Sequence, residues 1–342
     1  MLSAVITCYR DAQAIPVMHA RLTAVFAALR VRYEIIFVND ASPDDADSVL
    51  ADLAATDDHV IAIEHSRNFG SQSAFLSGMQ IAQGSAVILL DGDLQDPPEL
   101  IAEFYAEWRK GNDVVYGRRR QRDGSPFLAL FCALFYRIFR GISSVSMPLD
   151  AGDFALMDRR VVNELLALPE TDQFLRGLRA WVGFRQTGID YVRPRRRFGR
   201  STHSWLGKLW WAKKGIFSFT FVPIAILGYL ACALMGLAIV AVGYQGVDLL
   251  RHPERPHGTS VLIVVVMFFG SLNLLAVAII GEYLIKIFEE AKRRPKFIRK
   301  AIRQGQDVFS AGSELEAFLL RRSQLASSRR VLNPRPLAGD EG

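Results

Sequence analysis

Over residues 1–116, short runs of β-branched and other apolar residues alternate with segments of helical periodicity. The runs are apolar throughout rather than at every second position, which is typical of strands that are buried on both faces. The pattern therefore predicts an α/β fold in which helices cover both sides of a mostly parallel sheet. The expected strands lie near residues 2–8, 33–39, 59–64, 85–91 and 112–116.

Two longer apolar runs follow, because no Asp, Glu, Lys or Arg occurs in residues 215–247 or in residues 258–281. A helix of about 20 residues crosses the hydrocarbon core of a bilayer, so each run is long enough to span a membrane. We therefore expect a two-helix transmembrane hairpin over residues 211–288, with spans near 218–244 and 259–281.

Basic residues flank both expected spans, and such residues mark the cytoplasmic side of a membrane. The N-terminus has neither the basic region nor the cleavage site of a signal peptide, so the N-terminal domain is expected to stay in the cytosol. We therefore expect a multi-pass protein of the inner (cell) membrane with both termini in the cytoplasm. The basic residues are Lys208, Lys213 and Lys214 before the first span, and Lys286, Lys292, Arg293, Arg294, Lys296, Arg299 and Lys300 after the second.

The remaining segments complete the expected organisation. Residues 1–210 form the α/β domain, with a further αβ stretch over residues 153–193. Residues 126–140 combine Phe, Leu and Tyr with basic positions and are too short to span, which predicts a helix in the membrane interface or packed on the spans. Residues 289–342 are expected to be a basic cytoplasmic tail whose last 20 residues are disordered.

Composition supports contact with lipid, since 50% of the residues are hydrophobic and the mean hydropathy is +0.16. The net charge of +6 is explained by the basic membrane flanks. No nucleic-acid-binding motif accompanies that charge, so we expect no nucleic-acid partner. The three cysteines are far apart and match no metal or redox spacing, which favours buried filler roles in a reducing compartment.

Carboxylates gather where the expected strand over residues 85–91 ends. Asp91, Gly92 and Asp93 are followed by Gln95, so two carboxylates and an amide oxygen can turn toward one cation. Mg²⁺ and Mn²⁺ prefer such oxygen ligands, and either ion would neutralise charge on a diphosphate. We therefore expect a divalent metal at Asp91, Asp93 and Gln95. Asp96 precedes a proline and is expected to be a helix N-cap.

Two other strand ends carry polar residues at the same edge of the expected sheet. Asp40 follows residues 33–39, and Tyr9 and Asp11 follow residues 2–8. Short acidic side chains can accept hydrogen bonds from a pyrimidine or a ribose, and Tyr9 offers an aromatic face. A turn-forming aspartate is an equally good explanation for each carboxylate.

Several segments resemble family-2 glycosyltransferases, most of all bactoprenol glucosyltransferases and dolichol-phosphate mannose synthases. The resemblance runs from residue 2 to about residue 290 and includes the two apolar runs. It implies a GT-A fold, a nucleotide-sugar donor that Tyr9, Asp11, Asp40, Asp91 and Gly92 contact, and a polyprenyl-phosphate acceptor. The segments that carry it are Val5–Tyr9, Glu34–Ser42, Ser66–Gly70, Asp91–Pro98, Asp113–Gly117 and Leu149–Phe154.

The resemblance also places an acceptor-side carboxylate at Asp153 or, as the second choice, at Asp150. A phosphate monoester has a second pKa near 6 and is mostly a dianion at neutral pH, so it hardly needs a general base. The carboxylate is then expected to orient the sugar or to accept a residual proton. A helix-capping role in this segment is the alternative.

Donor and acceptor both carry phosphate, so cationic side chains are needed beyond the metal, and the planar fork of arginine suits phosphate oxygens. The alternative for any one of these residues is a solvated side chain or one at the lipid headgroups. The family often has Lys where Thr202 stands, and Arg200 or Lys208 is the expected substitute. The candidates are Arg119, Arg122, Arg176, Arg200 and Lys208.

Together these features predict inverting transfer of a hexose to undecaprenyl phosphate at the cytoplasmic membrane face. The resemblance implies UDP-glucose as the first donor, ahead of GDP-mannose, a UDP-amino sugar or a 4-amino-arabinose donor. A homo-oligomer, as a tetramer, is expected from the resemblance. A processive polysaccharide synthase would need a channel that two spans do not provide, and a catalytically inactive membrane scaffold is the non-enzyme alternative.

Overall fold

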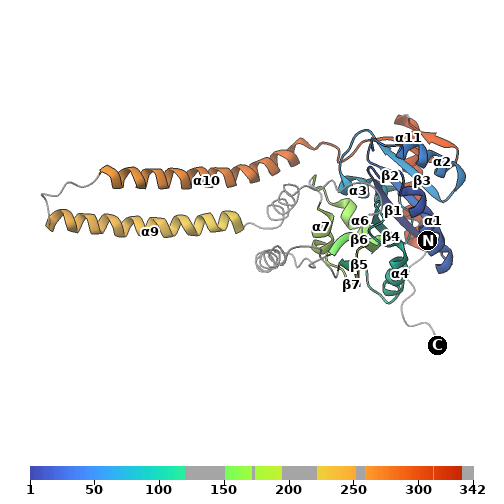
Figure 1. Cartoon of the computed structure of the whole chain (residues 1–342), viewed down its shortest axis with the longest axis horizontal. Coiled ribbons are helices and arrows are strands. Elements are labelled where there is room, and N and C mark those ends of the chain that lie inside the picture. Colours follow the sequence, from blue (N-terminus) through green and yellow to red (C-terminus); the bar gives the residue numbers. More distant parts are fainter. Residues whose placement is uncertain (120–150, 172–173, 195–221, 252–258, 311, 333–342) are drawn as a thin grey trace. The chain divides into compact units, whose positions relative to one another are not determined.

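The computed structural model describes residues 1–119, 151–171, 174–194, 222–251, 259–310 and 312–332 (Figure 1). These residues belong to two compact units. The first unit contains the described parts of residues 1–194 and 294–332, and the second contains the described parts of residues 222–293. The expected interfacial helix at residues 126–140 lies outside the described residues.

The described residues of the first unit form a nine-stranded sheet in the order β7-β5-β6-β4-β1-β2-β3-β8-β9. All five strands predicted from the apolar runs are present, each within a few residues of its expected bounds. The strands are β1 (Leu2–Cys8), β2 (Tyr33–Asn39), β3 (Val60–His65), β4 (Ala86–Asp91), β5 (Val114–Arg119), β6 (Ala151–Asp158), β7 (Gln186–Tyr191), β8 (Arg299–Gln304) and β9 (Asp307–Phe309).

Strand directions show that the sheet is mixed. β4, β1, β2 and β3 are parallel in the centre, and β5 is parallel to β7. β6 is antiparallel to β4 and β5, and β8 is antiparallel to β3 and β9. Only β6 and β8 run against the other described strands, so the prediction of a mostly parallel sheet is correct except at these two strands. Apolar runs show that a strand is buried but not which way its neighbour runs.

Helices cover both faces of this sheet, as predicted. α1 (Ile15–Leu29), α2 (Ala46–Thr56) and α4 (Ile101–Arg109) bury Met18, Leu50 and Phe104 in one apolar core with alternate residues of the strands. α3 (Ser71–Ile81) and α6 (Arg159–Ala167) pack on the other face. A Cβ atom at Gly78 would lie 2.3 Å from Val5 Cγ1. Only glycine at position 78 therefore allows α3 to pack this closely on β1. The short helices η1 (Pro98–Leu100) and α7 (Leu175–Trp181) complete this part.

Residues 299–332, which the sequence placed in a basic tail, return to the first unit. β8 extends the sheet beside β3 and buries Ala301 and Ile302, and α11 (Gly312–Leu332) packs on α3. Arg322 of α11 forms a buried ion pair with Glu34 and donates to the carbonyl of Ile81 at 2.8 Å. Residues 323–332 lie within α11. β8 contains only two apolar residues, so its pattern does not indicate a strand.

The second unit contains two long apolar helices, α9 (Val222–Arg251) and α10 (Thr259–Lys292), which contact each other. Within the described residues, one segment meets the length and hydropathy of a membrane span. It is Val265–Lys292, with a mean hydropathy of 2.0 in its most apolar window and no buried residues there. This supports one expected span, and the two-span hairpin stays a prediction.

Candidate active site

The Asp-Gly-Asp loop begins where β4 ends, directly beside the end of β1. Asp91 is the last residue of β4 and pairs with Thr7, and the amide of Gly92 donates to the carbonyl of Thr7 at 2.9 Å. A Cβ atom at Gly92 would lie 2.8 Å from that carbonyl oxygen, so the close approach needs glycine. Asp93 follows and accepts a hydrogen bond from the amide of Gln95 at 3.1 Å.

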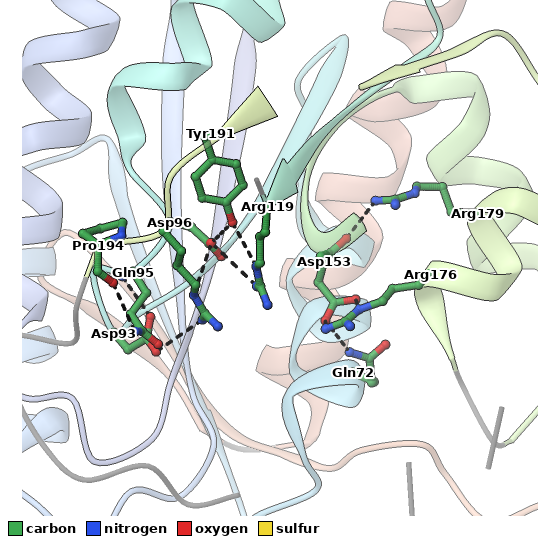
Figure 2. Close-up of polar contacts among 12 residues, drawn as sticks. Gln72, Asp93, Gln95, Asp96, Arg119, Asp153, Arg176, Arg179, Tyr191 and Pro194 are labelled. Atoms are coloured by element: carbon green, nitrogen blue, oxygen red, sulfur yellow. Dashed lines mark hydrogen bonds and ion pairs between the residues drawn. The ribbon is translucent and has the colours of Figure 1, made fainter. Parts of the chain in front are cut away.

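Negative charge is concentrated around Asp91. Burial, followed by the nearby charges of Asp96, Asp153 and Asp93, raises the pKa of Asp91 to about 7. The side-chain nitrogen of Gln95 donates to the carbonyl of Pro194 at 3.2 Å (Figure 2), so its amide oxygen is the atom that a cation could use. Crowded carboxylates with an added amide oxygen fit a hard divalent cation, which relieves their repulsion.

The proposed metal site consists of two carboxylates and one amide oxygen rather than a larger acidic cluster. In the part of the chain that the structure describes, no group of three or more Asp, Glu, His or Cys side chains is arranged to hold a metal ion. The Nη2 atom of Arg193 lies 3.8 Å from Asp93 Oδ2, so this carboxylate already has a cationic neighbour. Asp91, Asp93 and Gln95 therefore remain the predicted ligands.

Asp96 is the centre of a buried polar cluster that joins the end of β4 to β5 and β7 (Figure 2). The hydroxyl of Tyr191 donates to Asp96 Oδ1 at 2.5 Å, and Arg119 Nε donates to that hydroxyl at 3.2 Å. The helix after Asp96 has Pro97 at its N-cap position and no side-chain cap, so the N-cap prediction for Asp96 was wrong. Burial raises the pKa of Asp96, although Arg119 and Arg193 oppose that shift.

We expect Tyr191→Phe to lower the free energy of unfolding by about 1–3 kcal/mol, because a buried carboxylate would lose its hydroxyl donor. Urea denaturation of the full chain in detergent measures this change. Tyr105→Phe is the matched control, since the ring of Tyr105 packs on Trp108 and its hydroxyl has no hydrogen bond among the described residues. Equal losses in the two variants would contradict the assigned role of Tyr191.

Asp153 is the buried carboxylate on the other side of the site, near the start of β6. Arg176 of α7 binds it through two hydrogen bonds, Nε to Oδ1 at 3.0 Å and Nη2 to Oδ2 at 2.8 Å (Figure 2). Gln72 of α3 donates to Oδ2 at 3.2 Å and accepts from the amide of Leu175 at 2.9 Å. Burial alone would raise the pKa of Asp153, but Arg176, Arg179 and Gln72 outweigh it and hold the pKa below the usual value.

Arg179 is a site residue that sequence reasoning missed. It is 3% exposed, its Nη1 donates to the carbonyl of Gly152 at 3.4 Å, and its guanidinium lies 5.1 Å from the ring centroid of Tyr116. Within the part of the chain that the structure describes, its Nε and Nη2 atoms have no hydrogen-bond partner. Burial lowers the pKa of Arg179 to about 10. The available signal was its position three residues after Arg176, which places both arginines on one face of a helix.

Asp40, proposed from the sequence as a nucleotide contact, organises a loop. It is 3% exposed, and its Oδ1 accepts hydrogen bonds from His65 Nδ1 at 2.8 Å and from the amide of Phe69 at 2.9 Å. Its Oδ2 accepts from the amide of Gly70 at 2.7 Å. The alternative left open from the sequence was a local turn, but these partners lie in a distant loop, at residues 65–70.

The other predicted residues occupy different positions. Asp11 is buried and accepts from the amide of Tyr9 at 3.4 Å, whereas Tyr9 itself is partly exposed. Arg119 lies against the start of β6, because a Cβ atom at Gly152 would be 2.9 Å from its Nη2. The structure thus brings the carboxylate loop, Arg119 and Asp153 to one region. Four predicted residues lie outside the described part of the chain: Arg122, Asp150, Arg200 and Lys208.

Sequence comparisons define the class of protein that carries this site. The glycosyl transferase family 2 model matches residues 3–166, which include the carboxylate loop, Asp40 and Asp153. The protein is therefore an enzyme, a glycosyltransferase, as predicted. The expected GT-A, Rossmann-like fold agrees with the mixed sheet and its helical layers.

Relatives match over almost their whole length. An uncharacterized glycosyltransferase of Synechocystis sp. is 38% identical over 87% of this chain and 94% of its own. A bactoprenol glucosyl transferase of Shigella phage SfV is 33% identical over 89% and 99%, and a putative glycosyltransferase of Bacillus subtilis is 34% identical over 88% and 91%. The chain belongs to glycosyl transferase family 2, which confirms the resemblance seen in the sequence.

Proposed function

We propose that this enzyme transfers a hexose, with glucose from UDP-glucose as the first donor, to undecaprenyl phosphate. The observation that carries the proposal is the near-complete match to proteins named bactoprenol glucosyl transferase, since 99% of their length is covered and the match includes the long apolar helices. A lipid acceptor cannot leave the bilayer, so an enzyme that acts on it gains from a membrane anchor.

On the donor side, Asp91, Asp93 and Gln95 would hold Mg²⁺ or Mn²⁺, which supplies positive charge beside the departing nucleoside diphosphate. Gly92 lets the loop backbone pass close to β1. Tyr9 and Asp11 border the same strand ends and are the proposed contacts to the nucleotide. Asp40 holds the loop of residues 66–70 in place beside the donor, in addition to any direct contact with the donor.

On the acceptor side, the low pKa of Asp153 keeps it ionised at neutral pH, so it has no proton to give. It holds Arg176 in a fixed orientation, and a fixed guanidinium suits phosphate oxygens. A dianionic phosphate oxygen then attacks the anomeric carbon while the nucleotide leaves on the opposite side, with inversion. Positioning and charge neutralisation therefore account for most of the catalysis. The further proposed phosphate contacts are Arg119, Arg122, Arg200 and Lys208.

For the membrane arrangement, we propose that α9 and α10 form a two-span hairpin in the inner membrane. The basic residues at the start and end of this region favour cytoplasmic termini and a cytoplasmic active site. A homo-oligomer, with a tetramer as the first candidate, and the absence of a nucleic-acid partner stay predictions from the sequence.

The test is a transfer assay with the purified full chain, undecaprenyl phosphate, Mg²⁺ or Mn²⁺, and a panel of labelled donors. UDP-glucose is expected to give lipid-linked label at the highest kcat/KM, with GDP-mannose, UDP-amino sugars and 4-amino-arabinose donors as competitors. The anomeric configuration of the product, read by NMR, tests inversion. Transfer from no donor would overturn the proposed function, and preference for another donor would overturn the glucose assignment.

A further inference from the structure

The residues that directly follow α10 rejoin the sheet beside the end of β3. α10 ends at Lys292, and after residues 293–296 the ring of Phe297 stacks on the ring of His65, with centroids 5.6 Å apart and an interplanar angle of 4°. The amide of Ser66 donates to the carbonyl of Ile298 at 3.0 Å. The first residues after the apolar helix thus contact both His65 and the loop that follows it.

The Phe297 segment is itself firmly held on α3. Arg299 donates through Nε to the hydroxyl of Ser77 at 3.0 Å and through Nη2 to the carbonyl of Ser77 at 2.7 Å. The same guanidinium lies 4.8 Å from the ring centroid of Phe297. Phe297 therefore occupies a defined position from which it can restrain its neighbours.

His65 depends on this stacking for its orientation. The ring is 1% exposed and donates from Nδ1 to Asp40 Oδ1 at 2.8 Å, but its buried Nε2 has no hydrogen-bond partner among the described residues. One hydrogen bond by itself does not define the plane of the ring. The parallel face of Phe297 and the edge of Phe69, at 5.6 Å and 87°, are the aromatic contacts that restrain that plane.

His65 in turn restrains a loop that reaches the acceptor side of the site. Asp40 accepts from His65 and from the amides of Phe69 and Gly70. Gly70 has a φ of +90° and precedes the first residue of α3. Gln72, two residues later, donates to Asp153. Contacts and a short stretch of chain therefore lead from Phe297 through His65, Asp40 and the loop of residues 66–70 to Asp153.

We propose that Phe297 is a positioning residue for glycosyl transfer, because its stacking on His65 holds Asp40, the loop of residues 66–70 and the first turn of α3 in place. The proposal rests on the proposed function for its kinetic consequence. It gives the connection after α10 a second role: the same short segment that leaves the apolar helix also fixes the geometry of the site.

The test compares Phe297→Ala with Phe297→Tyr and with Ile298→Ala in the full chain. Phe297 is only partly buried, so a tyrosine ring can stack there with its hydroxyl toward solvent. Ile298 is the adjacent control, with a side chain that is 51% exposed and a hydrogen bond to Ser66 that involves only its backbone. Phe297→Leu keeps an apolar side chain of similar size but lacks the aromatic ring. It replaces Phe297→Ala in the test if the alanine variant does not fold.

Two readouts decide the proposal. Loss of an aromatic contact predicts that amide hydrogen exchange at Phe69 and Gly70 rises about three- to tenfold in Phe297→Ala, with kcat lower by a similar factor. Phe297→Tyr and Ile298→Ala should stay within twofold of the wild type, by the same reasoning about ring contacts. Unchanged exchange in Phe297→Ala and Phe297→Leu would overturn the proposal, as would faster exchange with an unchanged kcat. Hydrogen exchange is measured without substrate, so the exchange result tests the positioning role of Phe297 even if the wild type transfers no sugar.

Discussion

Asp93→Ala is expected to reduce glycosyl transfer by about 10²- to 10³-fold, the loss seen when one group that stabilises developing charge is removed. Asp93 lies in the loop after β4 rather than in the apolar core, so the variant should keep its fold. The lost carboxylate is one of the three proposed metal ligands, and the metal would no longer sit firmly beside the diphosphate. Initial rates at saturating Mn²⁺ measure the loss, and circular dichroism checks the fold.

Asp58→Ala is the matched control, because Asp58 is an exposed loop aspartate that precedes β3 at its other end. It should transfer at the wild-type rate. Chelation of divalent ions with EDTA should stop transfer by the wild type, and excess Mg²⁺ or Mn²⁺ should restore it. Activity that survives chelation, or an Asp93→Ala variant close to the wild type, would contradict the metal assignment.

The second large effect is expected for Asp153→Ala, which should lower the free energy of unfolding by about 3–5 kcal/mol. The substitution removes the carboxylate that compensates the positive charges of Arg176 and Arg179. Arg179 is only 3% exposed, so water cannot replace that compensation. Gln72 would also lose the acceptor that links α3 to β6. Transfer should fall as well, because Arg176 is no longer held. Urea denaturation and kcat of the same preparation measure both effects.

Asp190→Ala is the control for this prediction. Asp190 pairs with Arg118 at 2.7 Å, but the side chains are 31% and 47% exposed, and such surface pairs contribute about 0–1 kcal/mol. A loss in Asp190→Ala as large as that in Asp153→Ala would show that burial is not the cause of the effect.

The pH dependence of stability gives Asp153 an additional signature. Its pKa in the folded state is lower than the ordinary value of 3.8, so its ionised form stabilises the fold. That contribution is present above pH 3.8 and is lost as the pH falls through the lowered folded-state pKa. Wild type and Asp153→Asn should therefore differ most above pH 3.8 and converge in stronger acid, as followed by denaturation at a series of pH values.

The features predicted well from sequence are those that depend on neighbours along the chain. β1, β2 and β4 were found because each is a short run of apolar residues that ends in polar ones. The loop of Asp91 and Asp93 was placed correctly at a strand end for the same reason. α9 and α10 follow from two long runs without charge.

The features that sequence reasoning missed depend on partners far away along the chain. β8 is polar at most positions and becomes a strand because β3 offers it an open edge. Asp96 looked like a helix cap, yet its partner is Tyr191. Arg179 is buried because α7 packs on α6 and β6, and the pattern of α7 alone does not reveal this.

By itself, the sequence determined a Rossmann-like domain, its carboxylate loop, its apolar helices and its membership of a glycosyltransferase family, because burial periodicity and motifs are local. Only the tertiary structure decided which side chains meet. It turned Asp40 from a free strand-end carboxylate into the centre of a loop that His65 and Phe297 restrain, and it joined Asp153 to Arg176. Such pairs form between residues widely separated along the chain, so no local pattern of hydrophobic and polar positions contains them.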